Sequence, residues 1–94
     1  MENGNTVLAI EVLISKCFVD ARPNREILAQ DAHAFIRGVL KGTQYQKKDI
    51  SQARKNLKVR SECESGEYMW YWENENDPKE VWESKSRQYW EAST

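Results

Sequence analysis

The chain has few residues of the types that bind metals or act as catalytic nucleophiles. Its 94 residues include only two cysteines, Cys17 and Cys63, and one histidine, His33. These offer neither a disulfide framework nor metal-ligand spacing, so we expect reduced cysteines and no metal or other cofactor. One histidine also leaves no convincing Ser-His-Asp or Cys-His arrangement, and the carboxylates occur in runs typical of a solvated face. We therefore expect no enzyme and no small-molecule substrate.

The sequence also lacks a long apolar segment. Its longest apolar run, residues 7–10, is far too short to span a bilayer, so no membrane association is expected. No basic flank leads into an apolar stretch with a small-residue cleavage site, which predicts no secretory signal and a cytoplasmic location. Hydrophobic residues make up 39 % of the chain and charged residues 31 %, as in folded globular proteins. The length suits a single domain over residues 1–94.

The net charge is only −1, but the charges are unevenly distributed along the chain. Residues 41–60 carry seven lysines and arginines against a single acid, Asp49. Residues 62–83 carry eight acids against a single base, Lys79. Because a local basic surface matters more for nucleic-acid binding than the total charge, the near-neutral sum does not exclude a DNA-binding protein.

The first half of the chain predicts two helices. Residues 5–20 are densely apolar, which indicates a helix buried on more than one side, in the core or in a dimer interface. After a proline-containing break, a second helix is predicted over residues 24–42. Its apolar stripe is Leu28, Ala32, Phe35 and Val39, widened by Ile27, Ile36 and Leu40. His33 lies off this stripe and is expected to face solvent.

The second half predicts a helix, a hairpin and a last helix. Apolar residues recur every three or four positions over residues 45–58, which is typical of a helix. The period then becomes that of a strand, and a glycine-containing turn divides residues 59–73 into a predicted β-hairpin. Asp77 followed by proline and then glutamate is a strong helix start, so the final helix is predicted over residues 77–91. The predicted fold class is mainly α with a small β-hairpin (α+β).

The helix predicted over residues 45–58 has a polar face opposite its apolar one. That face carries four side chains able to hydrogen-bond: Lys48, Ser51, Gln52 and Lys55. Such a row suits base edges in a DNA major groove, because glutamine pairs with adenine and lysine donates to guanine. Other basic residues are better placed for phosphates: Lys41, Lys47, Arg54, Lys58 and Arg60. The pattern predicts contact with duplex DNA, although an ordinary solvated helix face shows the same pattern.

Residues 45–61, with Gly66 and the Trp70-Tyr71-Trp72 segment, resemble the winged-helix segment at the C-terminal ends of phage- and plasmid-type replication ATPases and primases. The matching positions are Ile50, Ala53, Arg54, Leu57, Val59, Ser61, Trp70 and Trp72. The resemblance covers about 30 of the 94 residues. It implies a winged helix-turn-helix of three helices and a wing, followed here by an added C-terminal helix.

The resemblance further implies a DNA-binding module of a phage or other mobile element, acting in replication or transcription regulation. The sequence departs from the family pattern in its acid-rich hairpin and in three other respects. Lys58 stands where glycine is usual, which bears on the turn after the helix. The second helix is longer than expected. The chain also has no Gly-x-x-x-x-Gly-Lys motif for ATP phosphates.

The acidic hairpin supports an alternative interpretation. Glu62, Glu64 and Glu67 surround the predicted turn, where DNA phosphates would repel them. Seven tryptophans and tyrosines fall within residues 68–90, which suits core packing, base stacking or self-association. The alternative is therefore a non-catalytic protein-interaction or homodimerisation module that uses its acidic and aromatic C-terminal part. Its expected interface is formed by Trp82, Tyr89 and Trp90.

Overall fold

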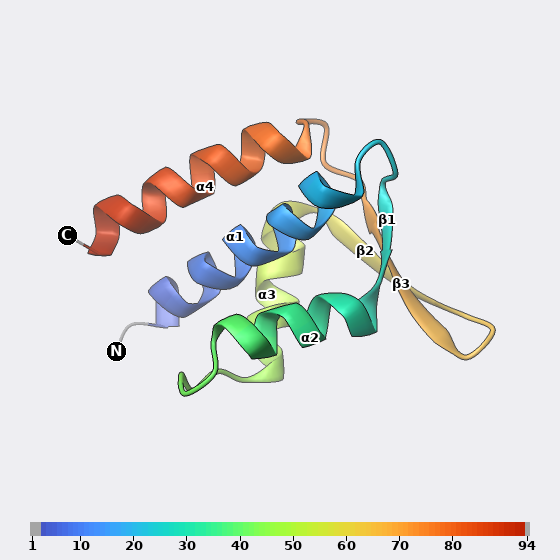
Figure 1. The fold of residues 1–94 in the computed structure, drawn as a ribbon, viewed down its shortest axis with the longest axis horizontal. Helices are drawn as coiled ribbons and strands as arrows, with labels where there is room; N and C mark the ends of the chain where they lie inside the picture. Colours follow the sequence, from blue (N-terminus) through green and yellow to red (C-terminus); the bar gives the residue numbers. More distant parts are fainter. Residues whose placement is uncertain (1–2, 94) are drawn as a thin grey trace.

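The computed structural model describes residues 3–93, which form four helices and a three-stranded antiparallel sheet (Figure 1). In chain order the elements are α1 (Asn3–Ala21), β1 (Glu26–Leu28), α2 (Ala29–Val39), α3 (Lys47–Leu57), β2 (Val59–Glu64), β3 (Glu67–Trp72) and α4 (Pro78–Ser93). The strand order is β1-β3-β2, so β3 is the central strand. The mixed α+β class matches the sequence-based prediction at this level.

Helix α1 is the element around which the others pack. Ile10, Ile14 and Phe18 recur every four residues along it and are completely buried. Helix α4 lies along α1, and α3 packs against a different side of α1 (Figure 1). This arrangement accounts for the apolar residues around most of the α1 circumference. The predicted range of residues 5–20 lies within the observed helix.

The predicted second helix, residues 24–42, is wrong at its start. Residues Glu26–Leu28 form β1, in which Ile27 lies opposite Trp70 of β3. The backbone N–H of Trp72 also donates to the Arg25 carbonyl at 2.9 Å. In the first turn of a helix, the backbone N–H groups have no intrahelical hydrogen-bond partner. Pairing with β3 supplies partners for the backbone of this segment instead. A strand of three residues is too short to show a period of its own.

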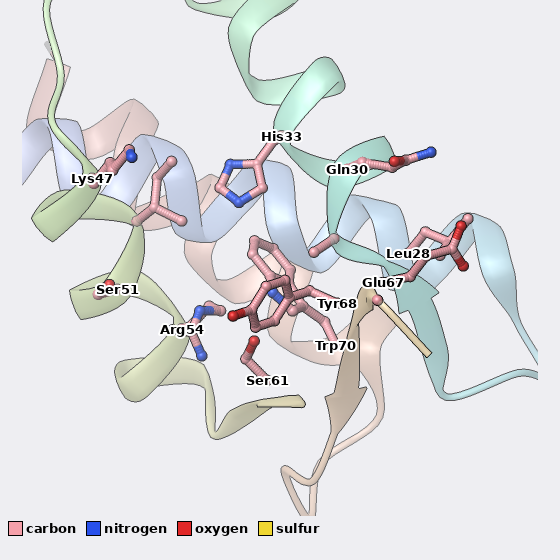
Figure 2. Close-up of a pocket in the computed structure, with 13 residues that line it drawn as sticks. Leu28, Gln30, His33, Lys47, Ser51, Arg54, Ser61, Glu67, Tyr68 and Trp70 are labelled. Carbon is pink, nitrogen blue, oxygen red and sulfur yellow. The ribbon is translucent and has the colours of Figure 1, made fainter. Parts of the chain in front are cut away.

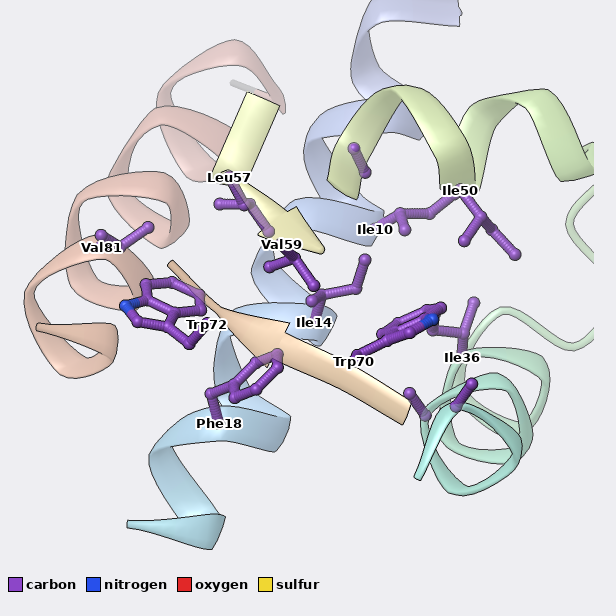
Figure 3. Close-up of a cluster of buried hydrophobic side chains, with 13 residues drawn as sticks. Ile10, Ile14, Phe18, Ile36, Ile50, Leu57, Val59, Trp70, Trp72 and Val81 are labelled. Atoms are coloured by element: carbon purple, nitrogen blue, oxygen red, sulfur yellow. The ribbon is translucent and has the colours of Figure 1, made fainter. Parts of the chain in front are cut away.

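The buried face of α2 agrees with the predicted stripe at Ala32 and Ile36 but not at Phe35 and Val39. Ala29, Ala32 and Ile36 are buried, whereas Phe35 and Val39 are 38 % and 53 % exposed. Strand β1 attaches the start of α2 to β3, so the rotation of the helix is set by the sheet rather than by its own most hydrophobic residues. Ile36 accordingly lies beside the Trp70 indole in the core (Figure 3).

Helix α3 begins and ends with well-defined capping geometry, inside the predicted range of residues 45–58. The Asp49 carboxylate accepts the Gln46 N–H at 2.9 Å, and the Asp49 N–H donates to the Gln46 backbone carbonyl at 3.0 Å. At the other end, Lys58 adopts φ 60° and ψ 48° and donates its N–H to the last turn. The left-handed turn that normally uses glycine is therefore formed by a lysine.

We expect the substitution Lys58→Gly to raise the free energy of unfolding by about 0.5–1 kcal/mol. The left-handed conformation costs a residue with a Cβ atom about 1–2 kcal/mol, which exceeds the entropic cost of ordering glycine. Urea unfolding followed by circular dichroism measures the change. The matched control is Lys55→Gly, because Lys55 is exposed but helical and its replacement should lose about 1 kcal/mol. Effects of the same sign at both positions would contradict this explanation.

Strands β2 and β3 form a hairpin in continuous register from Val59 opposite Trp72 to Glu64 opposite Glu67. Ser65 and Gly66 connect them with φ values of 53° and 86°, the positive angles of a tight two-residue hairpin turn. One face of the hairpin is buried through Val59, Trp70 and Trp72, and Figure 3 shows Phe18 of α1 beside the Trp72 indole. Trp70 and Trp72 of β3 thus attach the hairpin to the core, which is the core-packing alternative of the sequence analysis.

Helix α4 starts immediately after the cap predicted at Asp77, whose carboxylate accepts the Lys79 N–H at 2.9 Å. It extends to Ser93, slightly beyond the predicted end at residue 91. Figure 1 shows that it returns along α1, so that its end approaches the start of α1. Among the helices described here, none combines the length and apolar character that crossing a lipid bilayer requires.

Candidate nucleic-acid interface

The four side chains predicted to face DNA bases lie on the side of α3 that points away from the core. Lys48, Gln52 and Lys55 are exposed and Ser51 is half-buried. Helix α4 packs on α1 and shares a surface pocket with α3 only near the C-terminal end of α3, at Asn56 and Leu57. The row therefore remains uncovered along the first two turns of α3. We name these four residues the α3 row.

The lysines in and around the α3 row are free to contact an external anion. Within residues 3–93, neither Lys48 nor Lys55 forms an ion pair with a carboxylate. The other lysines predicted to contact phosphates are also exposed: Lys41, Lys47 and Lys58. Together they give α3 and its flanking turns a positive surface although the whole chain is slightly acidic.

The two arginines predicted to contact phosphates already have partners within the domain. The Arg54 guanidinium lies 5.5 Å from the Trp70 ring centroid and donates to the Val59 carbonyl at 3.3 Å. Arg60 pairs with Glu62 and Glu73 and lies 4.5 Å from the Tyr71 ring centroid. The charge of Arg60 is therefore balanced within the sheet, whereas Arg54 retains guanidinium N–H groups that can reach a ligand.

A groove enclosing about 660 Å³ lies between α3, the start of α2 and the hairpin. Figure 2 shows Trp70 at its centre with His33, Arg54 and Tyr68 around it. The side of the groove formed by α3 carries Lys47, Ser51 and Arg54. Tyr68 of β3 also lines the groove and is 60 % exposed. The groove thus continues the positive surface of α3 toward the hairpin.

His33 lines this groove, which corrects the prediction that it faces solvent. Its ring stands edge-on to the Trp70 ring, with 5.2 Å between the centroids. Partial burial lowers the pKa of His33 below the usual 6.5, and three neighbouring positive charges lower it further: Arg37, Arg54 and Lys47. Both effects favour the neutral imidazole over the charged one. Local sequence patterns carry no signal for this contact, because the partner of His33, Trp70, is distant along the chain.

The acids of the hairpin are partly engaged by neighbours on the same sheet. Glu62 pairs with Arg60, and the Tyr71 hydroxyl donates to Glu64. The bond to Glu64 is the main reason that the pKa of Tyr71 is raised to about 12. Only Glu67 reaches the groove. The acidic hairpin tip therefore lies beside the positive surface of α3 and does not belong to that surface.

The three aromatic residues predicted as a protein interface differ in their exposure. Trp82 is half-buried, and the Lys16 ammonium of α1 lies 5.5 Å from its ring centroid. Tyr89 is half-buried and stands edge-on to Trp90 at 6.4 Å. Trp90 alone is largely open to solvent, with 68 % of its surface exposed.

Comparison with models of protein families, with curated proteins and with solved structures finds no match to the chain. The resemblance of residues 45–72 to replication ATPases and primases therefore stays a prediction. Function has to be inferred from the residues and geometry of the chain.

Proposed function

We propose that the domain is a winged helix-turn-helix that binds duplex DNA through α3. Helices α2 and α3 are joined by the short connection of residues 40–46 and would form the helix pair. The β2–β3 hairpin follows α3 directly and would be the wing, while β1 completes the sheet. Helix α4 is an addition that supports α1 on the side away from the groove.

The observation that carries this proposal is the uncovered α3 row. A helix that enters a major groove needs an exposed face of hydrogen-bonding and basic side chains above a firmly packed apolar face. Ile50, Ala53 and Leu57 supply the packed face and are buried. The α3 row supplies the other face, with two lysines that have no acidic partner among the described residues.

The groove and the hairpin support a particular docking mode. Lys47 and the remaining donors of Arg54 are placed to hold a phosphate beside the α3 row. The DNA backbone would repel the acidic hairpin tip. We therefore expect the hairpin to stay off the DNA, so that α3 makes the contacts. The resemblance alone suggests a protein of a phage or other mobile element that acts in replication or transcription regulation.

We expect Lys48→Ala and Lys55→Ala each to weaken binding to a mixed-sequence DNA duplex. Each substitution removes a positive charge from the surface that faces the DNA, so the slope of log affinity against log salt concentration should become shallower by up to about 0.9. Fluorescence anisotropy of a labelled duplex, started at low salt, measures both quantities.

The matched control is Lys79→Ala, which removes an exposed lysine from the start of α4. It should leave the affinity and the salt slope unchanged. The proposal fails if the wild-type protein does not bind duplex DNA, or if binding is insensitive to both α3 substitutions. The protein-interaction module would then be favoured, because Trp90 is exposed on α4 and the adjoining segment is acidic.

A further inference from the structure

A buried carboxylate connects three helices beneath the α3 row. Glu11 of α1 is 3 % exposed. The Lys85 ammonium of α4 lies 3.0 Å from Glu11 Oε1, and Asn56 Nδ2 of α3 donates to Glu11 Oε2 at 2.5 Å. Asn56 Oδ1 in turn accepts from Gln52 Nε2 at 2.9 Å. A continuous chain of polar contacts therefore runs from the buried Glu11 to a member of the α3 row.

The chemistry of Glu11 fixes the direction of every bond in this chain. An ionised carboxylate only accepts hydrogen bonds, so Asn56 has to turn its NH2 group toward Glu11. The Asn56 oxygen then faces Gln52, and Gln52 has to donate through Nε2. The Gln52 amide oxygen is left without a partner among these residues and is available to a ligand.

We propose that Glu11 is a positioning residue that determines which polar atom Gln52 presents to a DNA base. The inference rests on the proposed function, because it requires α3 to lie in the major groove. A free amide oxygen accepts from the N6 amino group of adenine, while the second Nε2 proton can donate to adenine N7. Guanine presents only acceptors at the same edge, so Gln52 in this orientation favours adenine.

Because Lys85 contacts Glu11, the isosteric substitution Glu11→Gln should reverse the proposed orientation of the Gln52 amide. An ammonium only donates, so in Glu11→Gln the new side-chain oxygen has to stay toward Lys85 and the new NH2 group has to face Asn56. Asn56 then turns its oxygen inward, and its NH2 group faces Gln52. Gln52 follows by turning its oxygen toward Asn56 and its NH2 group outward. Both partners of Glu11 keep a hydrogen bond, so the fold is retained.

Selection from a pool of DNA duplexes with randomised base pairs tests this inference. The base position read by Gln52 is the one whose preference disappears in Gln52→Ala. At that position the wild-type protein should favour adenine over guanine by about tenfold, and Glu11→Gln should move the preference to guanine. Adding Asn56→Asp to Glu11→Gln should restore adenine, because a carboxylate at position 56 accepts from both neighbours and returns Gln52 to its original orientation.

Two controls separate this inference from the proposed function. Lys79→Ala should leave the whole base preference unchanged. Side-chain amide signals of Asn56 and Gln52 in NMR spectra of the free protein should shift in Glu11→Gln, and the Gln52 signals should return in the double variant. The inference is overturned, with DNA binding intact, if Glu11→Gln keeps the adenine preference or if Gln52→Ala loses none. A wild-type protein that binds no duplex overturns the proposed function and the inference together.

Discussion

Replacing Trp72 with alanine is expected to lower the free energy of unfolding by about 3–5 kcal/mol, which is a large part of the stability of a domain of this size. The side chain is 3 % exposed and its ring centroid lies 5.2 Å from that of Phe18. Its indole N–H also donates to the Asn76 carbonyl at 2.9 Å. The substitution would leave a cavity between the hairpin and α1, and it would detach the segment that leads into α4.

Urea unfolding followed by circular dichroism measures this loss, and Trp90→Ala is the matched control. It removes the same side chain from an exposed position on α4, where the expected change is no more than about 0.5 kcal/mol. Trp72→Phe should lie between the two, because it keeps most of the contact with Phe18 but loses the bond to Asn76. Similar losses for Trp72→Ala and Trp90→Ala would contradict the assignment of Trp72 to the core.

The elements that were predictable from sequence are those whose causes are local. The start of α4 follows from Asp77 and the proline after it, and the hairpin follows from alternation around a Ser65-Gly66 turn. The face of α3 followed from helical spacing, because Ile50, Ala53 and Leu57 lie within eight residues of one another. Short-range patterns of this kind carry enough information to place an element without its neighbours.

The errors concern elements defined by distant partners. Strand β1 exists because Glu26–Leu28 pairs with residues of β3 more than forty positions later. That pairing also sets the rotation of α2, which buries Ala32 and Ile36 of the predicted stripe but leaves Phe35 and Val39 exposed. No local pattern distinguishes a three-residue edge strand from the first turn of a helix.

The same distinction between local patterns and distant partners applies to the candidate site. Exposure of Lys48, Gln52 and Lys55 followed from the helical wheel. The helical wheel could not predict that the two arginines have partners within the domain, because those partners are distant along the chain. Arg60 pairs with Glu73, and Arg54 contacts the Trp70 ring. The contact between Glu11 and Asn56 joins residues 45 positions apart. A sequence pattern can therefore supply the residue types of a polar surface, whereas their orientation depends on the tertiary structure.

Replacing Lys85 with methionine is expected to lower the free energy of unfolding by about 2–4 kcal/mol. The change leaves the buried Glu11 carboxylate without its only positively charged partner among the described residues, and an unpaired buried charge is strongly destabilising. The lower part of the range reflects the remaining hydrogen bond from Asn56 and the 25 % exposure of the Lys85 side chain. Urea unfolding followed by circular dichroism measures the loss.

Two comparisons show whether burial of Glu11, rather than the loss of any ion pair, causes this effect. Lys16→Met breaks a 2.8 Å pair with Asp20 at the surface of α1, and exposed pairs contribute at most about 1 kcal/mol. Combining Lys85→Met with Glu11→Leu removes both charges from the interior and should recover most of the lost stability, because apolar side chains of similar size can replace a buried pair. If Lys85→Met costs no more than Lys16→Met, or if the double variant is less stable than Lys85→Met alone, Glu11 does not depend on Lys85 for compensation of its charge.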